Sequence, residues 1–358
     1  ESGAIRLIVW QGALDIFKHY PILGSGVETF AYSYYTFRPA SHNLVSEWDF
    51  LYNKAHNEYL NYLANTGIVG FICYLAIILT FLIWNLKYFF SKPKNADINL
   101  LVLAIFASYI SYLIQNFFGF SVVSVALFFY LFPALTFILT NSIKTLKIPP
   151  MIHNTFPISQ LLYRRPLYTN LAKTFIIIIF GLIIITLFRN YWADTYFAVG
   201  NNASDAGNPG KAYNQLTNAV SLNPGEPYYR SELAFAAASA AVALSEDDPT
   251  TSARLKNEAI KETEKVLKES PKNVSFYRSA IRTYYLLSTL DPNFTDKTLQ
   301  VMDQTIALAP TDAKLIYNKA IILGQLGKNQ EAIKALEKAI ALKPNYSDAI
   351  KKLKEWNK

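Results

Sequence analysis

The residues best suited to chemistry in this chain of 358 residues are a histidine, His56, and an arginine, Arg6. His56 stands with Asn57 and Glu58 in a polar stretch directly before a long apolar run. An imidazole with an ordinary pKa of ~6.5 accepts a proton near neutral pH, and general-base catalysis typically contributes ~10²- to 10⁴-fold. A guanidinium binds phosphate oxygens through paired hydrogen bonds. The two residue types could therefore supply a base and a phosphate-binding group.

Each of these residues also has a simpler interpretation. A histidine before a membrane helix is usually an interfacial polar residue, and an arginine there can be a cation whose stem lies along apolar surface. Glu58, Glu47 and Asp49 could orient His56 or could form a solvated loop face. The two other histidines of this region, at positions 19 and 42, have no comparable context, so we interpret both as loop residues.

The segment before His56 is expected to hold a short helix, a tight turn and a long loop. Apolar residues at helical spacing predict a helix over residues 4–18, which places Arg6 and Trp10 on one side. The helix should end before Pro21. Gly24 and Gly26 then permit a tight turn, although no strand precedes them as a nucleotide-binding loop requires. Residues 27–53 are aromatic without a clear period, which predicts a loop over the membrane face.

Apolar segments follow, each with about the ~20 residues that cross a bilayer. They cover residues 67–90, 98–118, 121–141 and 172–190. Lys and Arg gather after the first segment and between the third and fourth, so the positive-inside rule places those loops in the cytoplasm and His56 outside. The segments hold almost no charge, which argues against a transporter. The single cysteine, Cys73, excludes a disulfide framework and a cysteine metal site.

The carboxyl-terminal half is a water-soluble helical repeat in composition and pattern. Prolines close similar helical stretches at positions 224, 271, 310 and 344, and subtraction gives spacings of 47, 39 and 34 residues. The last equals the period of a tetratricopeptide repeat. We expect units beginning near residues 193, 226, 273 and 312, with Gly327 at an inter-helix turn, Ala332 and Ala339 at the helix contact, and a cap helix over 347–357.

The ordered motifs of the first 140 residues resemble the O-antigen ligase and polymerase family. They are Arg6-x-x-x-Trp10, Pro21-Ile22-Leu23-Gly24-Ser25-Gly26, Ala55-His56-Asn57-x-Tyr59-Leu60 and Gly67-x-x-Gly70. The resemblance implies an inverting, metal-independent membrane glycosyltransferase without cofactor, which takes a glycan from a polyprenyl-diphosphate carrier outside the cytoplasmic membrane. It also implies that the loop histidine, here His56, activates the acceptor hydroxyl and that Arg6 holds the donor diphosphate. Asn57, Glu58, Trp10, Gly24 and Gly26 are expected at the substrate.

The fold expected is all-α: a polytopic membrane helix bundle followed by a soluble tetratricopeptide solenoid. Its parts are a catalytic loop region (1–66), three membrane helices (67–141), a cytoplasmic basic loop (142–171), a fourth membrane helix (172–190) and the repeats (193–358). Glu1-Ser2-Gly3 lacks an initiator Met, so we expect membrane helices before it. The charge of +8 is spread along the chain, which argues against nucleic acid.

Several alternatives stay open at this stage. The enzyme could be a ligase, a polymerase or a protein O-oligosaccharyltransferase, and the acceptor is open. The expected partners are the glycan donor and membrane lipid. The repeats could simply pack on the catalytic loop, or their groove could hold the acceptor, a protein or a glycan-assembly partner. A different class of function is a membrane-anchored repeat scaffold without catalysis.

Overall fold

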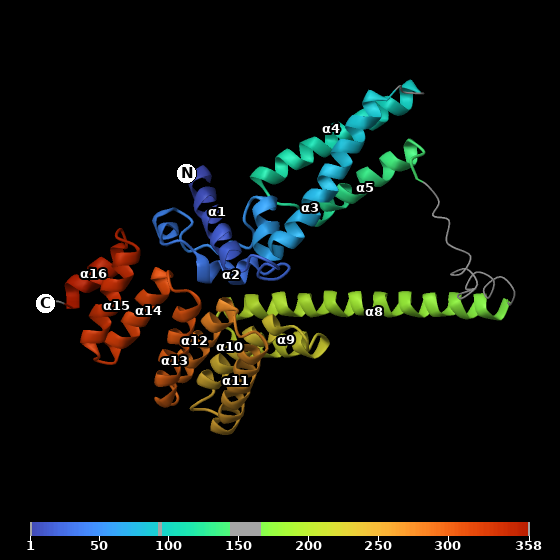
Figure 1. Cartoon of the computed structure of the whole chain (residues 1–358). Coiled ribbons are helices and arrows are strands. Elements are labelled where there is room, and N and C mark those ends of the chain that lie inside the picture. The colour runs from blue at the N-terminus through green and yellow to red at the C-terminus, as the bar shows by residue number, and fades with distance from the viewer. Residues whose placement is uncertain (1, 92–94, 144–165, 357–358) are drawn as a thin grey trace. The chain divides into compact units, whose positions relative to one another are not determined.

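The computed structural model describes residues 2–91, 95–143 and 166–356, and every regular element in these ranges is a helix (Figure 1). The expectation of an all-α chain is therefore confirmed. The helices have these bounds: α1 (Ser2–His19), α2 (Phe30–Phe37), η1 (Ala40–Leu44), α3 (Glu58–Phe90), α4 (Ala96–Phe118), α5 (Val123–Leu139), α8 (Pro166–Asp205), α9 (Pro209–Leu222), α10 (Pro227–Ala243), α11 (Pro249–Glu269), α12 (Val274–Leu287), α13 (Asn293–Leu308), α14 (Ala313–Gln325), α15 (Asn329–Leu342) and α16 (Ser347–Trp356).

The chain divides into two compact units. The first consists of Glu1–Ile143 and Met302–Lys358, and the second of Lys144–Val301. The first unit thus combines the segment with the candidate site residues and the last helical repeat.

Helix α1 is organised by a buried apolar face. Its buried residues recur at helical spacing and pack against α2 and α3, in a core formed by Ile5, Val9, Ala13, Ile16, Phe30, Tyr34, Tyr52, Ala55 and Ala64. The helix ends at His19, two residues before Pro21, as the sequence predicts. The expectation of an irregular loop over residues 27–53 was wrong in part, because α2 and η1 lie within it. These helices are too short to be stable alone and depend on tertiary packing.

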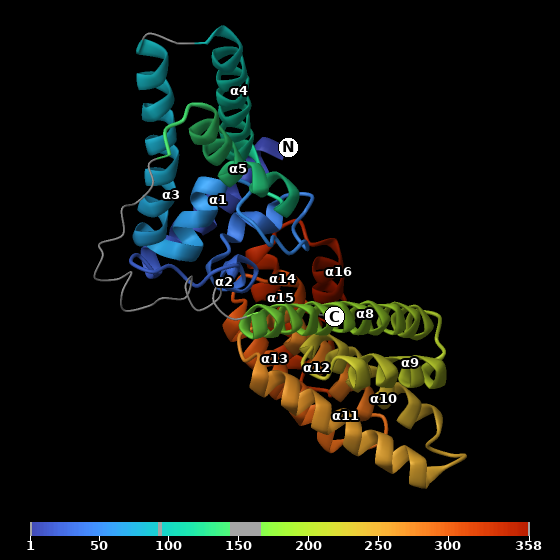
Figure 2. The ribbon, with the colours of Figure 1, turned by 90° about the vertical axis from the view of Figure 1, so that its right-hand side faces the viewer.

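Helices α3, α4 and α8 are long and apolar enough to cross a membrane, whereas α5, with 17 residues, is shorter (Figures 1 and 2). A buried aromatic cluster joins α3 to α4 and α5, with Tyr74, Phe81, Tyr109 and Phe129 among its members. Many other apolar side chains on these helices are exposed, as a lipid-facing surface requires. The protein is therefore a membrane protein.

The last repeat of the first unit is a helical hairpin. Helices α14 and α15 pack together, and α16 packs on α15. Gly327 adopts φ 71° in the turn between α14 and α15, and Ala332 and Ala339 are fully buried. The expected roles of these three residues are confirmed, since a left-handed turn favours glycine and close helix contact favours alanine.

The second unit begins with a helix that serves two purposes. The apolar part of α8 exposes its side chains from Phe175 to Phe188, and the same helix continues to Asp205, where it packs against α9. The predicted membrane segment over 172–190 and the first helix of the repeats are thus one continuous helix. Most of the basic loop expected over 142–171, including Lys144, Lys147, Arg164 and Arg165, lies outside the described residues.

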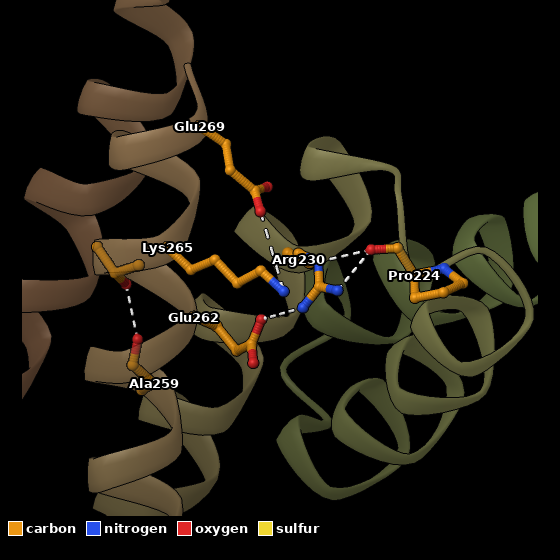
Figure 3. Close-up of polar contacts among 7 residues, drawn as sticks. Pro224, Arg230, Ala259, Glu262, Lys265 and Glu269 are labelled. Carbon is orange, nitrogen blue, oxygen red and sulfur yellow. Dashed lines mark hydrogen bonds and ion pairs between the residues drawn. The ribbon is translucent and has the colours of Figure 1, made fainter. Parts of the chain in front are cut away.

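The remaining helices of this unit pack as successive pairs, with α10 against α9, α11 and α12. Figure 3 shows how a buried arginine closes one turn: the Arg230 guanidinium donates to the Pro224 carbonyl, at 2.9 Å from Nε, and pairs with Glu262 at 2.7 Å. Pro224 marks the end of the first repeat in the sequence pattern. The Pro224 carbonyl is thus paired by a side chain of α10.

Candidate active site

The glycine-rich turn after α1 binds a break in α3. At Gly67 the backbone leaves the helical region, with φ 62° and ψ −165°, which frees backbone groups on both sides of the break. The turn satisfies these groups through four hydrogen bonds of 2.9 to 3.3 Å: Ser25 N–H to Ala64 O, Gly26 N–H to Asn65 O, Ile68 N–H to Pro21 O and Val69 N–H to Ile22 O. Gly24 and Gly67, which subtraction places 43 residues apart in the sequence, thus belong to one backbone structure.

Gly24 and Gly26 therefore have a structural contact as well as their predicted role at the substrate. Gly24 adopts φ 71° and Gly26 adopts φ 121°, which are conformations that favour glycine. A Cβ atom on Gly24 would collide with the backbone of Asn65. The turn holds the start of α3, and with it His56, against the end of α1.

His56 lies just before α3 in a left-handed conformation, with φ 53°. Its ring is partly buried between Tyr52 and Phe120, at centroid distances of 5.4 and 5.1 Å. Burial lowers the pKa of His56, and the nearby charge of Arg6 lowers it further, whereas the Glu47 charge acts in the opposite direction. A neutral imidazole at physiological pH is the form that accepts a proton. A non-glycine residue held at positive φ is also a common feature of functional sites.

Arg6 comes from α1 and is brought to His56 by the packing of that helix against α3. It is partly exposed. No salt bridge between Arg6 and another described residue occurs, so its guanidinium can bind an anion that enters the site. Nor does any group of three or more His, Cys, Asp or Glu side chains gather to form a metal site within the described ranges.

The side chains of Asn57 and Glu58 accept hydrogen bonds from backbone N–H groups of the protein. The Asn57 side chain caps α3 by accepting a hydrogen bond from Leu60 N–H at 3.1 Å. The buried Glu58 carboxylate accepts one from Ser121 N–H at 3.2 Å, in the turn between α4 and α5. Phe120 of the same turn contacts the His56 ring. The α4–α5 turn thus completes the site, and the sequence carried no signal for this beyond Gly119.

Trp10, expected at the substrate, packs its ring edge against Phe117 of α4 at 5.8 Å. Its indole N–H is buried and has no hydrogen-bond partner among the described residues. A buried unpaired donor is costly in a folded protein. The expected contact of Trp10 with the substrate stays a prediction.

A second histidine, predicted from the sequence to be a loop residue, is the centre of a buried network. The side chain of His42 is fully buried and contacts Tyr34 OH through Nδ1 at 2.7 Å and the Glu47 carbonyl through Nε2 at 3.2 Å. A carbonyl only accepts, so Nε2 carries the hydrogen and Nδ1 accepts from Tyr34. Burial, and then the charge of Arg38, lowers the pKa of His42 to about 4. The imidazole is therefore neutral at physiological pH.

Tyr52 connects this network to His56. Its ring contacts His42 at 5.3 Å and His56 at 5.4 Å, and its hydroxyl donates to the Glu47 carboxylate. The only sequence signal for this arrangement was the density of aromatic residues in 27–53, because the spacing of the histidines does not show that they share a neighbour.

A cavity of about 500 Å³ lies beside the turn between α4 and α5. Phe120, which contacts the imidazole, lines it together with Glu58 and tyrosines of α3, α4 and α5, including Tyr62, Tyr74, Tyr112 and Tyr130. The Lys54–Glu28 ion pair also lies on its wall. Aromatic faces beside a carboxylate and an ammonium group suit a polar ring-shaped ligand such as a sugar.

Comparison with known families covers the part of this site that lies within residues 1–75. Residues 1–75 match the family model described as O-antigen ligase, a range that contains Arg6, Trp10, Gly24, Gly26 and the residues from His56 to Glu58. The chain carries an O-antigen ligase domain. The break in α3 at Gly67 and the glycine turn that binds it also lie inside the ligase domain.

Residues 313–346, which form α14 and α15, match the model described as tetratricopeptide repeat. No protein of curated function matches the chain. Among solved structures, MamA (residues 41 to the end) from Desulfovibrio magneticus RS-1 is 20% identical, with 46% of this chain and 83% of MamA covered and a TM-score of 0.35. A thermophilic TPR protein of Thermus thermophilus is 18% identical, covering 46% and 80% with the same TM-score.

Proposed function

We propose that the protein is a membrane glycosyltransferase that moves a glycan from a polyprenyl-diphosphate carrier to an acceptor hydroxyl, in the assembly of cell-surface polysaccharide or glycoconjugate. The observation that supports this most directly is the approach of Arg6 to His56 inside the ligase domain. The pair combines an anion-binding cation with a neutral imidazole. Neither residue needs a cofactor for the roles proposed here.

In the proposed reaction the acceptor oxygen attacks the anomeric carbon of the donor glycan from the face opposite the diphosphate. The acceptor proton passes to the His56 imidazole as the new C–O bond forms. The bond between the anomeric carbon and the diphosphate breaks, and its electron pair leaves with the diphosphate, which inverts the anomeric configuration. Arg6 stabilises the negative charge that grows on the leaving group, so the step requires no divalent metal.

The remaining site residues would act around this pair. The cavity beside Phe120 would hold a sugar ring, with Glu58 and the tyrosine hydroxyls as hydrogen-bond partners. Trp10 would donate its unpaired N–H to the substrate. Asn57, Gly24 and Gly26 would position His56 through the helix cap and the backbone hydrogen bonds described above.

The proposed location is the cytoplasmic membrane, with residues 1–66 and the repeats from residue 193 outside the cytoplasm. This follows from the basic residues expected in the 142–171 loop, from Lys87 at the end of α3, and from the positive-inside rule. Helices within 67–141 and 172–190 would span the bilayer. Ligase, polymerase and protein O-oligosaccharyltransferase activities share this chemistry and differ in the acceptor.

Reconstitution with a polyprenyl-diphosphate-linked glycan tests the proposal. We expect His56→Ala and Arg6→Ala to abolish transfer while membrane insertion persists, and His19→Ala, on the exposed end of α1, to retain it. Chelation of divalent metals should leave the wild-type rate unchanged. Full activity of both His56→Ala and Arg6→Ala would remove these two residues from the mechanism. Absence of transfer by the wild-type protein would favour the non-catalytic scaffold.

A further inference from the structure

The last tetratricopeptide repeat of the first unit makes close polar contacts with the loop that precedes His56. Four hydrogen bonds of 2.7 to 3.0 Å connect the loop residues Thr36, Arg38 and Asn43 to the repeat and to the residues directly before it. They are Thr36 Oγ1 to Leu308 O, Thr311 Oγ1 to Arg38 O, Asn43 Nδ2 to Thr311 O and Lys343 Nζ to Asn43 O. Lys314 adds an ion pair with Asp49.

Lys343 is the most unusual member of this contact. It lies at the carboxyl end of α15, is only 7% exposed, and places its ammonium group 4.5 Å from the centre of the Trp48 ring. Trp48 in turn packs against Tyr346 at 5.3 Å. A buried ammonium group is costly unless it is paired, and here the Asn43 carbonyl and the Trp48 ring face supply that pairing.

The sequence pattern marks the same lysine. Each helical stretch of the repeats ends with a residue directly before a proline, and in the three earlier stretches this residue is Asn223, Ser270 or Ala309. These side chains are short and neutral. The long cationic side chain of Lys343 is therefore not a requirement of the repeat fold, and its contacts lie on the loop instead.

A continuous set of contacts leads from Lys343 to His56. The residue that Lys343 binds, Asn43, directly follows His42, whose imidazole donates to the Glu47 carbonyl. Tyr52 packs on His42, donates to the Glu47 carboxylate and packs on His56. The position of the His56 ring thus depends on a loop that is hydrogen-bonded to the repeat.

We propose that the last tetratricopeptide repeat positions the catalytic loop, and that Lys343 is the positioning residue that holds the segment before His56 in place. The inference rests on the proposed glycosyl transfer by His56. It gives the repeat a role inside the catalytic unit, distinct from recruitment of a partner on a free groove.

The test compares full-length variants at position 343. Lys343→Met keeps a long apolar stem but removes the charge and the hydrogen bond to Asn43, so we expect kcat to fall about 10-fold with the donor KM unchanged. Chymotryptic cleavage after the exposed Phe50 should accelerate by about the same factor, because the loop opens more often. Lys343→Arg, which keeps the positive charge and the hydrogen-bond donor, should restore kcat and the cleavage rate to wild-type values. Lys338 is exposed, so Lys338→Met should change neither kcat nor the cleavage rate.

The inference is overturned if Lys343→Met leaves both kcat and the rate of cleavage after Phe50 unchanged, as Lys338→Met should. It is also overturned if Lys343→Met changes only one of these two quantities. A failure of Lys343→Arg to recover either would assign the effect to general disruption of the repeat and overturn it as well. If Lys343→Met does not fold, Trp48→Leu on the loop side should reproduce the paired loss. If wild-type protein transfers no glycan, the proposed function fails, and cleavage after Phe50 alone decides whether Lys343 holds the loop.

Discussion

Gly67 and Gly24 meet through their backbones: a Cβ atom on Gly67 would lie 2.5 Å from the Gly24 nitrogen. Both residues have positive φ. Their approach allows the turn after α1 to supply hydrogen bonds to the break in α3. Two glycines that are separate in the sequence thus form one backbone joint in the structure.

We therefore expect Gly67→Ala and Gly24→Ala each to destabilise the ligase domain by several kcal/mol, since Cβ would collide with backbone and the left-handed conformation adds ~1 kcal/mol. Thermal unfolding in detergent measures the loss. Gly181→Ala in α8, where a Cβ meets open space, is the matched control. Equal melting temperatures for the three variants would contradict a stabilising role for the backbone contact between Gly24 and Gly67.

The backbone of His56 predicts a separation of stability from activity. At φ 53° a glycine is more stable than any residue with a Cβ. His56→Gly should therefore be more stable than His56→Ala by about 1 kcal/mol, while both lack transfer activity. Unfolding and transfer are measured on the same preparations. A less stable His56→Gly would show that the loop does not impose this conformation.

The environment of His56 predicts an acid limb in the pH profile. Because its pKa lies below the ordinary ~6.5, the imidazole should stay neutral, and kcat/KM constant, from alkaline pH to below that value before falling. Glu47→Gln removes the negative charge that raises the pKa, so the limb should move to lower pH. The profile of the reconstituted enzyme measures both midpoints. A move to higher pH would contradict the electrostatic assignment.

His42 predicts that the loop weakens in acid. Its pKa of about 4, against ~6.5 unfolded, means that the unfolded loop binds a proton first as pH falls. The stabilisation, about 3 kcal/mol, is fully present above pH ~6.5 and is lost as pH falls towards 4. The rate of cleavage after Phe50 by an acid-tolerant protease should rise across this window, relative to cleavage of an unfolded reference peptide. His42→Phe, which cannot be protonated, should abolish the rise.

The proposed topology predicts that α16 is reachable from outside the cell membrane. In a Cys73→Ser background, Lys351→Cys introduces a thiol on the exposed face of α16. It should react with an impermeant thiol reagent in intact cells, or in spheroplasts where an outer membrane is present. A second thiol at Lys87, at the end of α3, should react only after lysis. The opposite pattern would reverse the orientation of the whole chain.

The helical class, the helix before Pro21 and the turn at Gly327 could all be predicted from the sequence, whereas the catalytic roles of His56 and Arg6 stay predictions. These features depend on local periodicity, on proline and glycine geometry, and on motifs in a fixed order, which are readable along one chain. The apolar lengths of α3, α4 and α8 likewise follow from composition.

Only the tertiary structure decided what surrounds those residues. The burial of His42, the contact of Phe120 with His56, the joint between Gly24 and Gly67, and the reach of Lys343 to Asn43 join segments separated by up to 300 positions. No local preference specifies such pairs, because α2 and η1 form, and polar groups such as the Lys343 ammonium are buried, only when distant segments supply the packing and the hydrogen bonds.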